Sequence, residues 1–466
     1  MISIFDRRIK KLNNSWIFEY VIVLLFIVFG FIGWKYSFSY SGMGIIVLTI
    51  LLLFVFNDFK YIIPAGISLL FSYNSGYEVT SFPVKIAVYG GLLIFIVVLF
   101  SLLNFKLENF KKPKSYIGIV LLSISCMIPI FWNSVITKES SLMYFIYFTW
   151  VLYVVLYFVF GVNLGKNSLR IAIFTFSSLI ILLSSECLLT VLKMHNENPN
   201  ENILSFTYSL GWGICNEAGI MLCFCLPFVF YELIKTKNSI ISIICVLKVF
   251  ACLVGIVLTT SRAALLVGGF EALVFFILTM IFSKKKITNL VFFILLGLLS
   301  ILFIHLYYGF ERLFEDIKNV VFEYGFGGDG RERLYKGAYE LWSKNWLNRI
   351  LGSGIVSELE HRVSYGREDA LVFTVYHSTF FETLVMGGIF GILCLLFHFY
   401  EKYKQLWKKE LPFVLVMLVG YLAVDAYGML DNTYGMYYYM VPLVILMASL
   451  DNDKNTDIFN YELIGA

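Results

Sequence analysis

The sequence predicts an all-α protein that crosses a membrane many times, and three observations lead to this fold class. Of the 466 residues, 59% are hydrophobic and 15% are charged, whereas a soluble domain carries roughly 25% charged residues. The apolar residues fall in runs close to the roughly 20 residues that a helix needs to cross the hydrocarbon core. The basic residues gather in the connections between these runs, mainly in alternate ones.

Successive apolar runs predict about 14 transmembrane helices, within a range of about 12 to 14. The third run is short and contains Pro64, so the count is open between residues 43 and 73. The runs are 16–34, 43–57, 60–73, 84–104, 115–137, 143–163, 169–191, 208–231, 239–260, 262–282, 288–309, 377–400, 411–428 and 432–450.

Charge placement orients these helices, because basic residues collect in cytoplasmic loops. With both termini in the cytoplasm, the clusters 7–11, 111–114, 284–286 and 402–409 all lie on the inner side. We therefore expect a multi-pass protein of the cytoplasmic (inner or plasma) membrane. The first run lacks a small-residue cleavage site, which predicts an uncleaved span rather than a signal peptide. The basic residues of the short outer segments are Lys35, Lys85, Lys138, Lys193 and Arg262.

Three regions follow from this pattern. Residues 1–309 form an N-terminal bundle of about 11 spans, and residues 377–466 form about three spans and a short cytoplasmic tail. Between them, residues 310–376 form a long extracytoplasmic loop. The loop contains a predicted amphipathic helix that Asp329 caps, with Glu332 as its capping-box partner. One face of this helix carries Leu334, Ala338, Leu341 and Trp342.

Charged and polar residues inside apolar runs are functional candidates, because burying them in lipid is costly. Lys248 and Glu271 lie at similar depths in adjacent runs. We expect a structural ion pair between them, with a proton or ion pathway as the alternative. Asn216 and Glu217 could line an outward-open cavity or bond to neighbouring helices. The polar residues within the other runs include Glu186 and Asp425.

Arg262 stands at the outer end of the run that it opens. A cation in the first turn of a helix opposes the helix dipole. An anion bound at the unpaired N–H groups there would compensate, which predicts an anion site. The alternative is an arginine that snorkels to the interface.

His377 stands in a similar place, just before a run that Ser378 or Thr379 can cap, with Glu382 in the first turn. The helix dipole disfavours a protonated imidazole at this end, and a neutral ring can act as a general base. A solvated interfacial histidine is the simpler alternative. We take His377, Arg262 and Glu382 as candidate catalytic residues.

The long loop supplies further candidates for binding an anionic substrate. Arg331, Arg333 and Arg349 can bind phosphate oxygens in pairs, or can lie on a solvated helix face. Gly352 and Gly354 allow a tight turn or a close approach to a ligand. With Asn216 and Glu217, these residues complete the predicted site for a diphosphate and a glycan.

Cationic groups near the outer interface suit a substrate with an anionic head and a lipid tail, such as a lipid diphosphate. No metal-site or nucleotide-binding motif occurs. We therefore predict no metal and no cofactor, and a reaction driven by the leaving diphosphate. The net charge of +4 is spread over short clusters, so we expect no nucleic-acid partner.

Four segments of the C-terminal 60% or so carry a family resemblance, in the family's order. They are GWGICNEAGIMLCFCLPF, TTSRAALLVGG, RERLYKGAYELWSKNWLNRILGSG and HSTFFETLVMGGIFGILCLL. Together they resemble the O-antigen ligase and polysaccharide polymerase superfamily of membrane glycosyltransferases. In two respects the chain departs from the family: Ser378 follows His377 where asparagine is common, and the Arg-Gly pair described for some polymerase loops is missing.

The resemblance implies that an oligosaccharide passes from an undecaprenyl diphosphate carrier to an acceptor sugar on the outer face, without metal. It implies that Arg262 and either Arg331 or Arg333 hold the diphosphate, and that His377 assists the transfer.

From these features we expect a polymerase that joins lipid-linked repeat units of a capsule, an exopolysaccharide or an O-antigen. A ligase that transfers finished glycan to another acceptor fits equally well. A flippase for lipid-linked oligosaccharide is the alternative from another class, and a peptidoglycan-type polymerase with a catalytic loop acid is a further one. Expected partners are membrane lipids and other assembly proteins, such as a flippase and a chain-length regulator.

Overall fold

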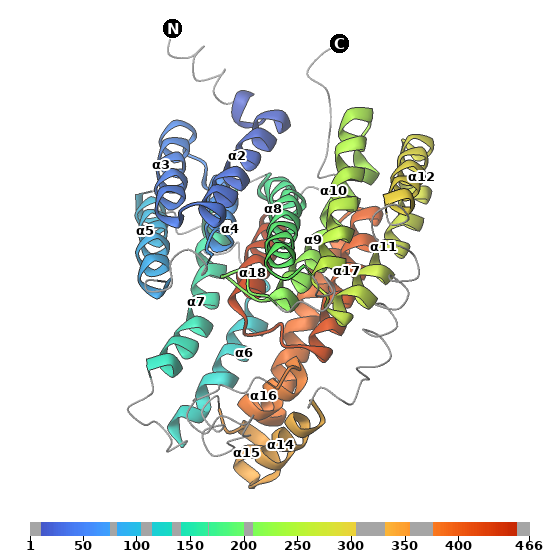
Figure 1. Ribbon diagram of the computed structural model, residues 1–466. Coiled ribbons are helices and arrows are strands. Elements are labelled where there is room, and N and C mark those ends of the chain that lie inside the picture. Colours follow the sequence, from blue (N-terminus) through green and yellow to red (C-terminus); the bar gives the residue numbers. More distant parts are fainter. Residues whose placement is uncertain are drawn as a thin grey trace.

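The computed structural model describes residues 11–74, 82–103, 114–132, 141–165, 167–199, 208–303, 331–354 and 376–453. Within these ranges the elements are helices, and the sole extended pairing is an isolated bridge between Ser209 and Ile214. This confirms the predicted all-α class. Most helices form one elongated bundle, and α14 and α15 lie at the end opposite the first residues of α2 (Figure 1). We call the end that carries α14 and α15 the loop end.

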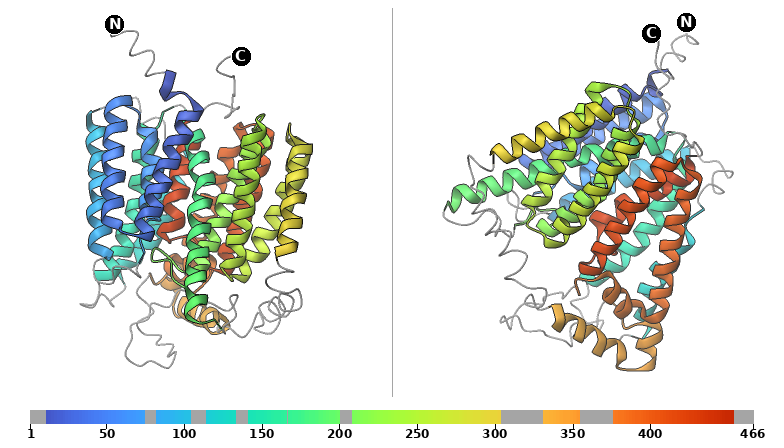
Figure 2. Two further views of the ribbon diagram at one scale, coloured as in Figure 1. Left: turned by 45° about the horizontal axis from the view of Figure 1, so that its top comes forward. Right: turned by 90° about the vertical axis from the view of Figure 1, so that its right-hand side faces the viewer.

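The N-terminal helices form one flank, seen at the left in the left-hand view of Figure 2. Its elements are α2 (Trp16–Lys35), α3 (Phe38–Phe56), η1 (Phe59–Tyr61), α4 (Ile62–Leu70), α5 (Phe82–Leu103), α6 (Ile117–Met127), η3 (Ile128–Phe131) and α7 (Ser141–Asn163).

The middle of the chain supplies the central helices and the opposite flank, where α12 lies at the periphery (Figure 2). These elements are α8 (Ser168–Glu197), α9 (Cys215–Lys235), α10 (Ser239–Leu258), α11 (Arg262–Phe282) and α12 (Lys286–Phe303). The loop helices and the C-terminal helices follow: α14 (Arg331–Ser343), α15 (Trp346–Leu351), α16 (Thr379–Lys404), η8 (Gln405–Lys408), α17 (Leu411–Leu430) and α18 (Tyr437–Asn452).

Each predicted apolar run overlaps a helix. Eight helices of the described residues are long and apolar enough to cross a membrane: α2, α3, α8, α9, α10, α11, α16 with η8, and α17. Shorter apolar helices cover Phe59–Leu70, Val88–Leu103, Ile117–Met127, Thr149–Asn163 and Lys286–Leu299. The larger count of about 14 spans stays a prediction.

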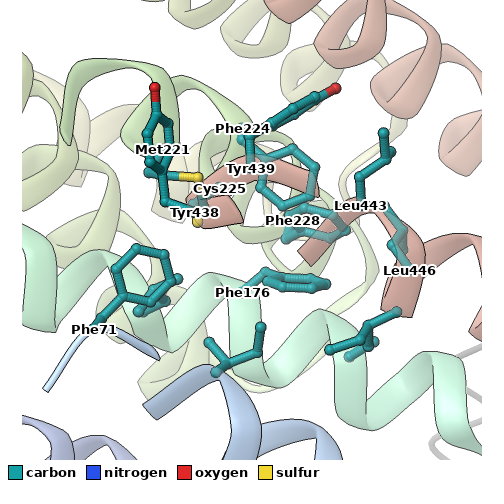
Figure 3. Close-up of a cluster of buried hydrophobic side chains, with 14 of the residues drawn as sticks. Phe71, Phe176, Met221, Phe224, Cys225, Phe228, Tyr438, Tyr439, Leu443 and Leu446 are labelled. Atoms are coloured by element: carbon teal, nitrogen blue, oxygen red, sulfur yellow. The ribbon is translucent and has the colours of Figure 1, made fainter. Parts of the chain in front are cut away.

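The core lies where α8, α9 and α18 meet, shown in Figure 3. Phe176 of α8 packs between two rings of α9, with ring centroids 5.3 Å from Phe224 and 4.9 Å from Phe228. Tyr439 of α18 packs on Phe224 at 5.6 Å. The C-terminal helices therefore share one core with the N-terminal bundle, and α9 is buried along nearly its whole length.

The start of α9 differs from the run predicted over 208–231. Residues 208–214 form a loop instead, because Gly211 has a left-handed φ of 96° that a helix cannot contain. Cys215 N–H donates to the carbonyl of Tyr208 at 3.0 Å and closes this loop. Burial raises the pKa of the Tyr208 hydroxyl, which therefore stays protonated and donates to the carbonyl of Leu258 at 3.0 Å.

The predicted ion pair between Lys248 and Glu271 is wrong. Lys248 Nζ lies 3.2 Å from Glu232 Oε2 and 3.0 Å from Ser177 Oγ. Glu271 is buried beside the Cys223 thiol on a different side of α9. Equal depth in neighbouring helices did not suffice to predict the ion pair. The direction in which a side chain projects from its helix also decides which partner it meets. Glu232 also lies just beyond the predicted end of its run.

A break in α16 joins the bundle to the loop helices. Gly388 has non-helical angles (φ 62°, ψ −156°), so the preceding carbonyls lose their helical partners. The turn 351–354, which we call the glycine turn, replaces them: Ser353 N–H donates to Val385 O at 2.8 Å, and Gly354 N–H to Met386 O at 3.2 Å. The loop thereby completes the hydrogen bonding of a helix whose backbone has to be satisfied internally.

Candidate functional site

Several helix ends converge at the loop end, and Tyr427 near the end of α17 links three of them. Its hydroxyl donates to the carbonyl of Asn216, in the first turn of α9, at 3.1 Å. The same hydroxyl lies 2.7 Å from Oγ of Ser261, the N-cap of α11. One turn further on, Asp431 N–H donates to the Tyr427 carbonyl at 2.9 Å. The starts of α9 and α11 are therefore fixed against the end of α17.

The start of α16 reaches the same place through His377. Nδ1 of His377 lies 3.0 Å from Oδ1 of Asp431, and the two side chains are 41% and 12% exposed. A carboxylate oxygen can only accept, so Nδ1 carries the proton in this hydrogen bond and Nε2 of a neutral ring carries the lone pair. A half-exposed imidazole held in this tautomer is suited to general-base chemistry.

A second contact, between Thr379 and Thr433, fixes the segments that carry His377 and Asp431 relative to each other. Oγ1 of Thr379 accepts a hydrogen bond from Thr433 N–H at 3.1 Å and lies 3.2 Å from Thr433 Oγ1. Thr379 follows His377 by two residues, as Thr433 follows Asp431. The start of α16 therefore runs alongside the turn 431–434, and His377 has a left-handed φ of 48° at the point where the chain enters.

Two further carboxyl groups interact electrostatically with the imidazole. Glu382 Oε2 accepts from Tyr376 N–H at 3.1 Å, and its charge interacts with that of His377. Glu217 Oε2 accepts from Ile214 N–H at 2.5 Å, and its charge interacts with those of His377 and Asp431. Glu217 and Glu382 therefore lie within electrostatic range of His377.

The caps of the two helix starts differ from each other. Ser261 caps α11, because its Oγ accepts from Ala264 N–H at 3.4 Å, and Arg262 is the first helical residue, as predicted. Ser378 occupies the N-cap position of α16, but its side chain makes no capping hydrogen bond. Binding of a diphosphate by Arg262 stays a prediction.

The predicted loop helix forms, and its apolar face packs on the start of α16. The face is confirmed for Leu334, Ala338 and Leu341, which are buried against Tyr376 and Val385. Helix α14 begins at Arg331, while its predicted cap Asp329 lies outside the described residues.

Trp342, which was predicted on the apolar face of this helix, is half-buried and does not belong to the cluster of Leu334, Ala338 and Leu341. It packs beside the exposed Tyr339, and its Nε1 donates to Arg349 O at 3.1 Å.

Tyr335 of α14 contacts the chain next to the imidazole. Its ring stacks on Phe381 with centroids 4.5 Å apart, and its hydroxyl donates to the carbonyl of His377 at 3.4 Å. A displacement of α14 would therefore move the backbone that carries His377.

The three arginines predicted to bind substrate differ in how far the structure describes them. Arg331 and Arg333 lie in the first turn of α14, and their side chains lie outside the part of the chain that is described. Arg349 donates from Nε and Nη2 to the carbonyl of Ser343, at 3.2 Å and 2.9 Å. This contact closes the C-terminal end of α14, where a cation is favourable. Substrate binding by these arginines stays a prediction.

Gly352 and Gly354 form a tight turn, as predicted, with left-handed φ values of 80° and 74°. A Cβ on Gly352 would lie 2.2 Å from the Met386 carbonyl oxygen. The small size of these glycines thus allows the turn to approach the backbone of α16 closely.

Sequence reasoning missed Asp431 and Tyr427. The predicted runs ended at 428 and resumed at 432, which left Asp431 in a short connection that received no role. The presence of an acidic residue at the same end of the bundle as His377 could have indicated a role for Asp431. Nothing local distinguishes the Tyr427 hydroxyl from those of the many other tyrosines.

Residues 247–396 match the family model described as O-antigen ligase. This segment is similar to the O-antigen ligase family. The match runs from α10 into α16 and includes Arg262, the loop helices, His377 and Glu382; Asp431 lies beyond it. No curated protein matches the chain. The match supports the resemblance to the O-antigen ligase and polymerase superfamily, and the apolar helices indicate an integral membrane protein.

Proposed function

We propose that the protein is a polymerase that joins oligosaccharide repeat units carried on undecaprenyl diphosphate, at the outer face of the cytoplasmic membrane. The observation that carries this proposal is the His377–Asp431 pair, at the edge of the O-antigen ligase segment, where α9, α11 and α16 begin. Helix N-termini favour anions, and an imidazole held by a carboxylate can accept a proton from a hydroxyl.

In the proposed reaction, His377 Nε2 takes the proton of an acceptor-sugar hydroxyl while that oxygen attacks the anomeric carbon of the donor. The bond between this carbon and the diphosphate oxygen breaks, and its electron pair stays on the lipid diphosphate. Asp431 and Glu382 stabilise the imidazolium that forms, since opposite charges nearby favour the charged ring. Arg262 and Arg331 or Arg333 stabilise the negative charge that develops on the leaving group.

A ligase is the second candidate, because the matched family is described by that activity. The chemistry at His377 is the same in both cases, and the identity of the acceptor distinguishes them. A polymerase adds its glycan to another lipid-linked repeat unit, whereas a ligase uses a different acceptor.

Purified protein in liposomes, supplied with a lipid-diphosphate-linked oligosaccharide, tests the proposal. We expect a ladder of longer lipid-linked glycans that His377→Ala abolishes. The matched control is His195→Ala, which removes a histidine from the last turn of α8 and should keep the ladder.

A ladder that survives His377→Ala would remove the role of this residue. Transfer that requires an added acceptor would favour the ligase. Passage of the lipid-linked sugar across the bilayer without elongation would favour a flippase.

A further inference from the structure

Lys402 carries a buried charge that the proposed reaction does not use. Its ammonium lies 2.6 Å and 2.7 Å from the two carboxylate oxygens of Asp425, and 2.9 Å from the hydroxyl of Tyr434. The side chain of Lys402 is fully buried. An ammonium has three N–H donors, and these three partners match them, which is the condition for tolerating a buried ion pair.

Aromatic rings surround the same ammonium. Its Nζ lies 4.8 Å from the ring centroid of Phe399, 5.1 Å from that of Tyr403, 4.9 Å from that of Tyr421 and 5.6 Å from that of Tyr434. Ring faces attract a cation at such distances, and more strongly in the absence of water. The ammonium and Asp425 therefore hold a fixed position in the bundle.

Tyr434 connects this charge pair to the candidate site. Its hydroxyl binds Lys402, while its backbone N–H donates to Thr379 Oγ1 at 3.5 Å. Tyr434 is also the last residue of the turn 431–434, whose first residue, Asp431, holds the imidazole of His377. One residue thus bonds the buried lysine through its side chain and the start of α16 through its backbone.

We propose that Lys402, Asp425 and Tyr434 form a positioning site that sets the turn 431–434, and thereby holds Asp431 against His377. This proposal rests on the proposed function for its kinetic consequence alone. The structural consequence, a turn that depends on the Tyr434 hydroxyl, can be measured without any substrate.

Tyr434→Phe is the decisive variant, because it removes the hydroxyl that binds Lys402 and keeps the ring. Tyr421→Phe is the matched control: its ring also contacts Lys402, but its buried hydroxyl has no hydrogen-bond partner among the described residues. Hydrogen exchange of the peptide that covers 431–434, measured in nanodiscs, should become faster in Tyr434→Phe and stay unchanged in Tyr421→Phe. Equal exchange in the two variants would overturn the proposal, whether or not the protein polymerises glycan.

Kinetics provide the second readout. We expect Tyr434→Phe to lower kcat about tenfold, as for the loss of a hydrogen bond to a charged group, with KM for the lipid-linked donor unchanged. In an Asp431→Asn background the same substitution should have no further effect, because residues that act through one another are not additive. Full additivity would show that Tyr434 does not act through Asp431. A wild-type protein without activity would refute the proposed function and leave the exchange result to decide the positioning role.

Discussion

Gly352 and Gly388 are in direct backbone contact: a Cβ on Gly388 would lie 2.6 Å from the nitrogen of Gly352. One glycine belongs to the glycine turn 351–354 and the other to the break in α16, and both have left-handed φ values. No side chain fits between these two glycines, so the turn and the helix meet through backbone at this point.

Gly352→Ala should destabilise the protein by about 1–3 kcal/mol, because the residue has a left-handed φ and its Cβ would collide with a carbonyl. Thermal unfolding in detergent measures the loss. Gly337→Ala is the control: this glycine lies within α14, and a Cβ there would meet no atom of the described residues within 4 Å, while alanine favours the helix by up to about 1 kcal/mol. Equal melting temperatures for the two variants would contradict the described contact.

Asp431→Asn should lower turnover by a factor on the order of 10²–10⁴, as happens when the carboxylate partner of a catalytic histidine is replaced. The rate of glycan elongation measures this effect. The residual elongation rate of His377→Ala, measured at high enzyme concentration over long incubation, should not fall further in the double variant His377→Ala/Asp431→Asn, because the two residues act as a unit. A double variant slower by the full single effect would show that Asp431 acts independently of His377.

Arg262→Lys should raise KM for the lipid-linked donor, because lysine retains the charge but lacks the planar fork that binds two phosphate oxygens. Steady-state kinetics over a range of donor concentration measure it. Unchanged KM in Arg262→Lys together with a raised KM in Arg262→Ala would reduce the role of this residue to charge alone.

Arg349→Ala tests whether this arginine stabilises the fold rather than binds the substrate. Its guanidinium binds the Ser343 carbonyl at the end of α14, so we expect a stability loss of about 0.3–1 kcal/mol and an unchanged donor KM. A raised KM without a stability loss would instead support the predicted contact with substrate.

Lys248→Met should destabilise the bundle by about 3–5 kcal/mol, because it leaves Glu232 buried without its partner. Adding Glu232→Gln should recover much of the loss, whereas adding Glu271→Gln should recover none. Thermal unfolding of the three variants measures this. Recovery by the Glu271 substitution would restore the ion pair predicted from the sequence.

The sequence was informative about helices and poor at predicting which side chains meet. Apolar runs placed the helices because lipid requires long apolar segments, and His377 and Arg262 became candidates because polar groups at the ends of such segments are conspicuous. Asp431 was missed because its role depends on how α17 turns toward α16. The break at Gly388 was missed because its cause, the glycine turn, lies more than 30 residues earlier in the chain.

The backbone bonds between the glycine turn and α16 bear on how related loops can be exchanged. Val385 and Met386 receive their partners from residues 353 and 354, so a chimera that replaces 310–376 with a foreign loop would leave these carbonyls unsatisfied beside the membrane bundle. Loop length and charge could be matched without repairing this defect. A grafted loop would need two glycines at matching positions to form the same backbone bonds. The loop and the helix that follows it would therefore have to be exchanged together.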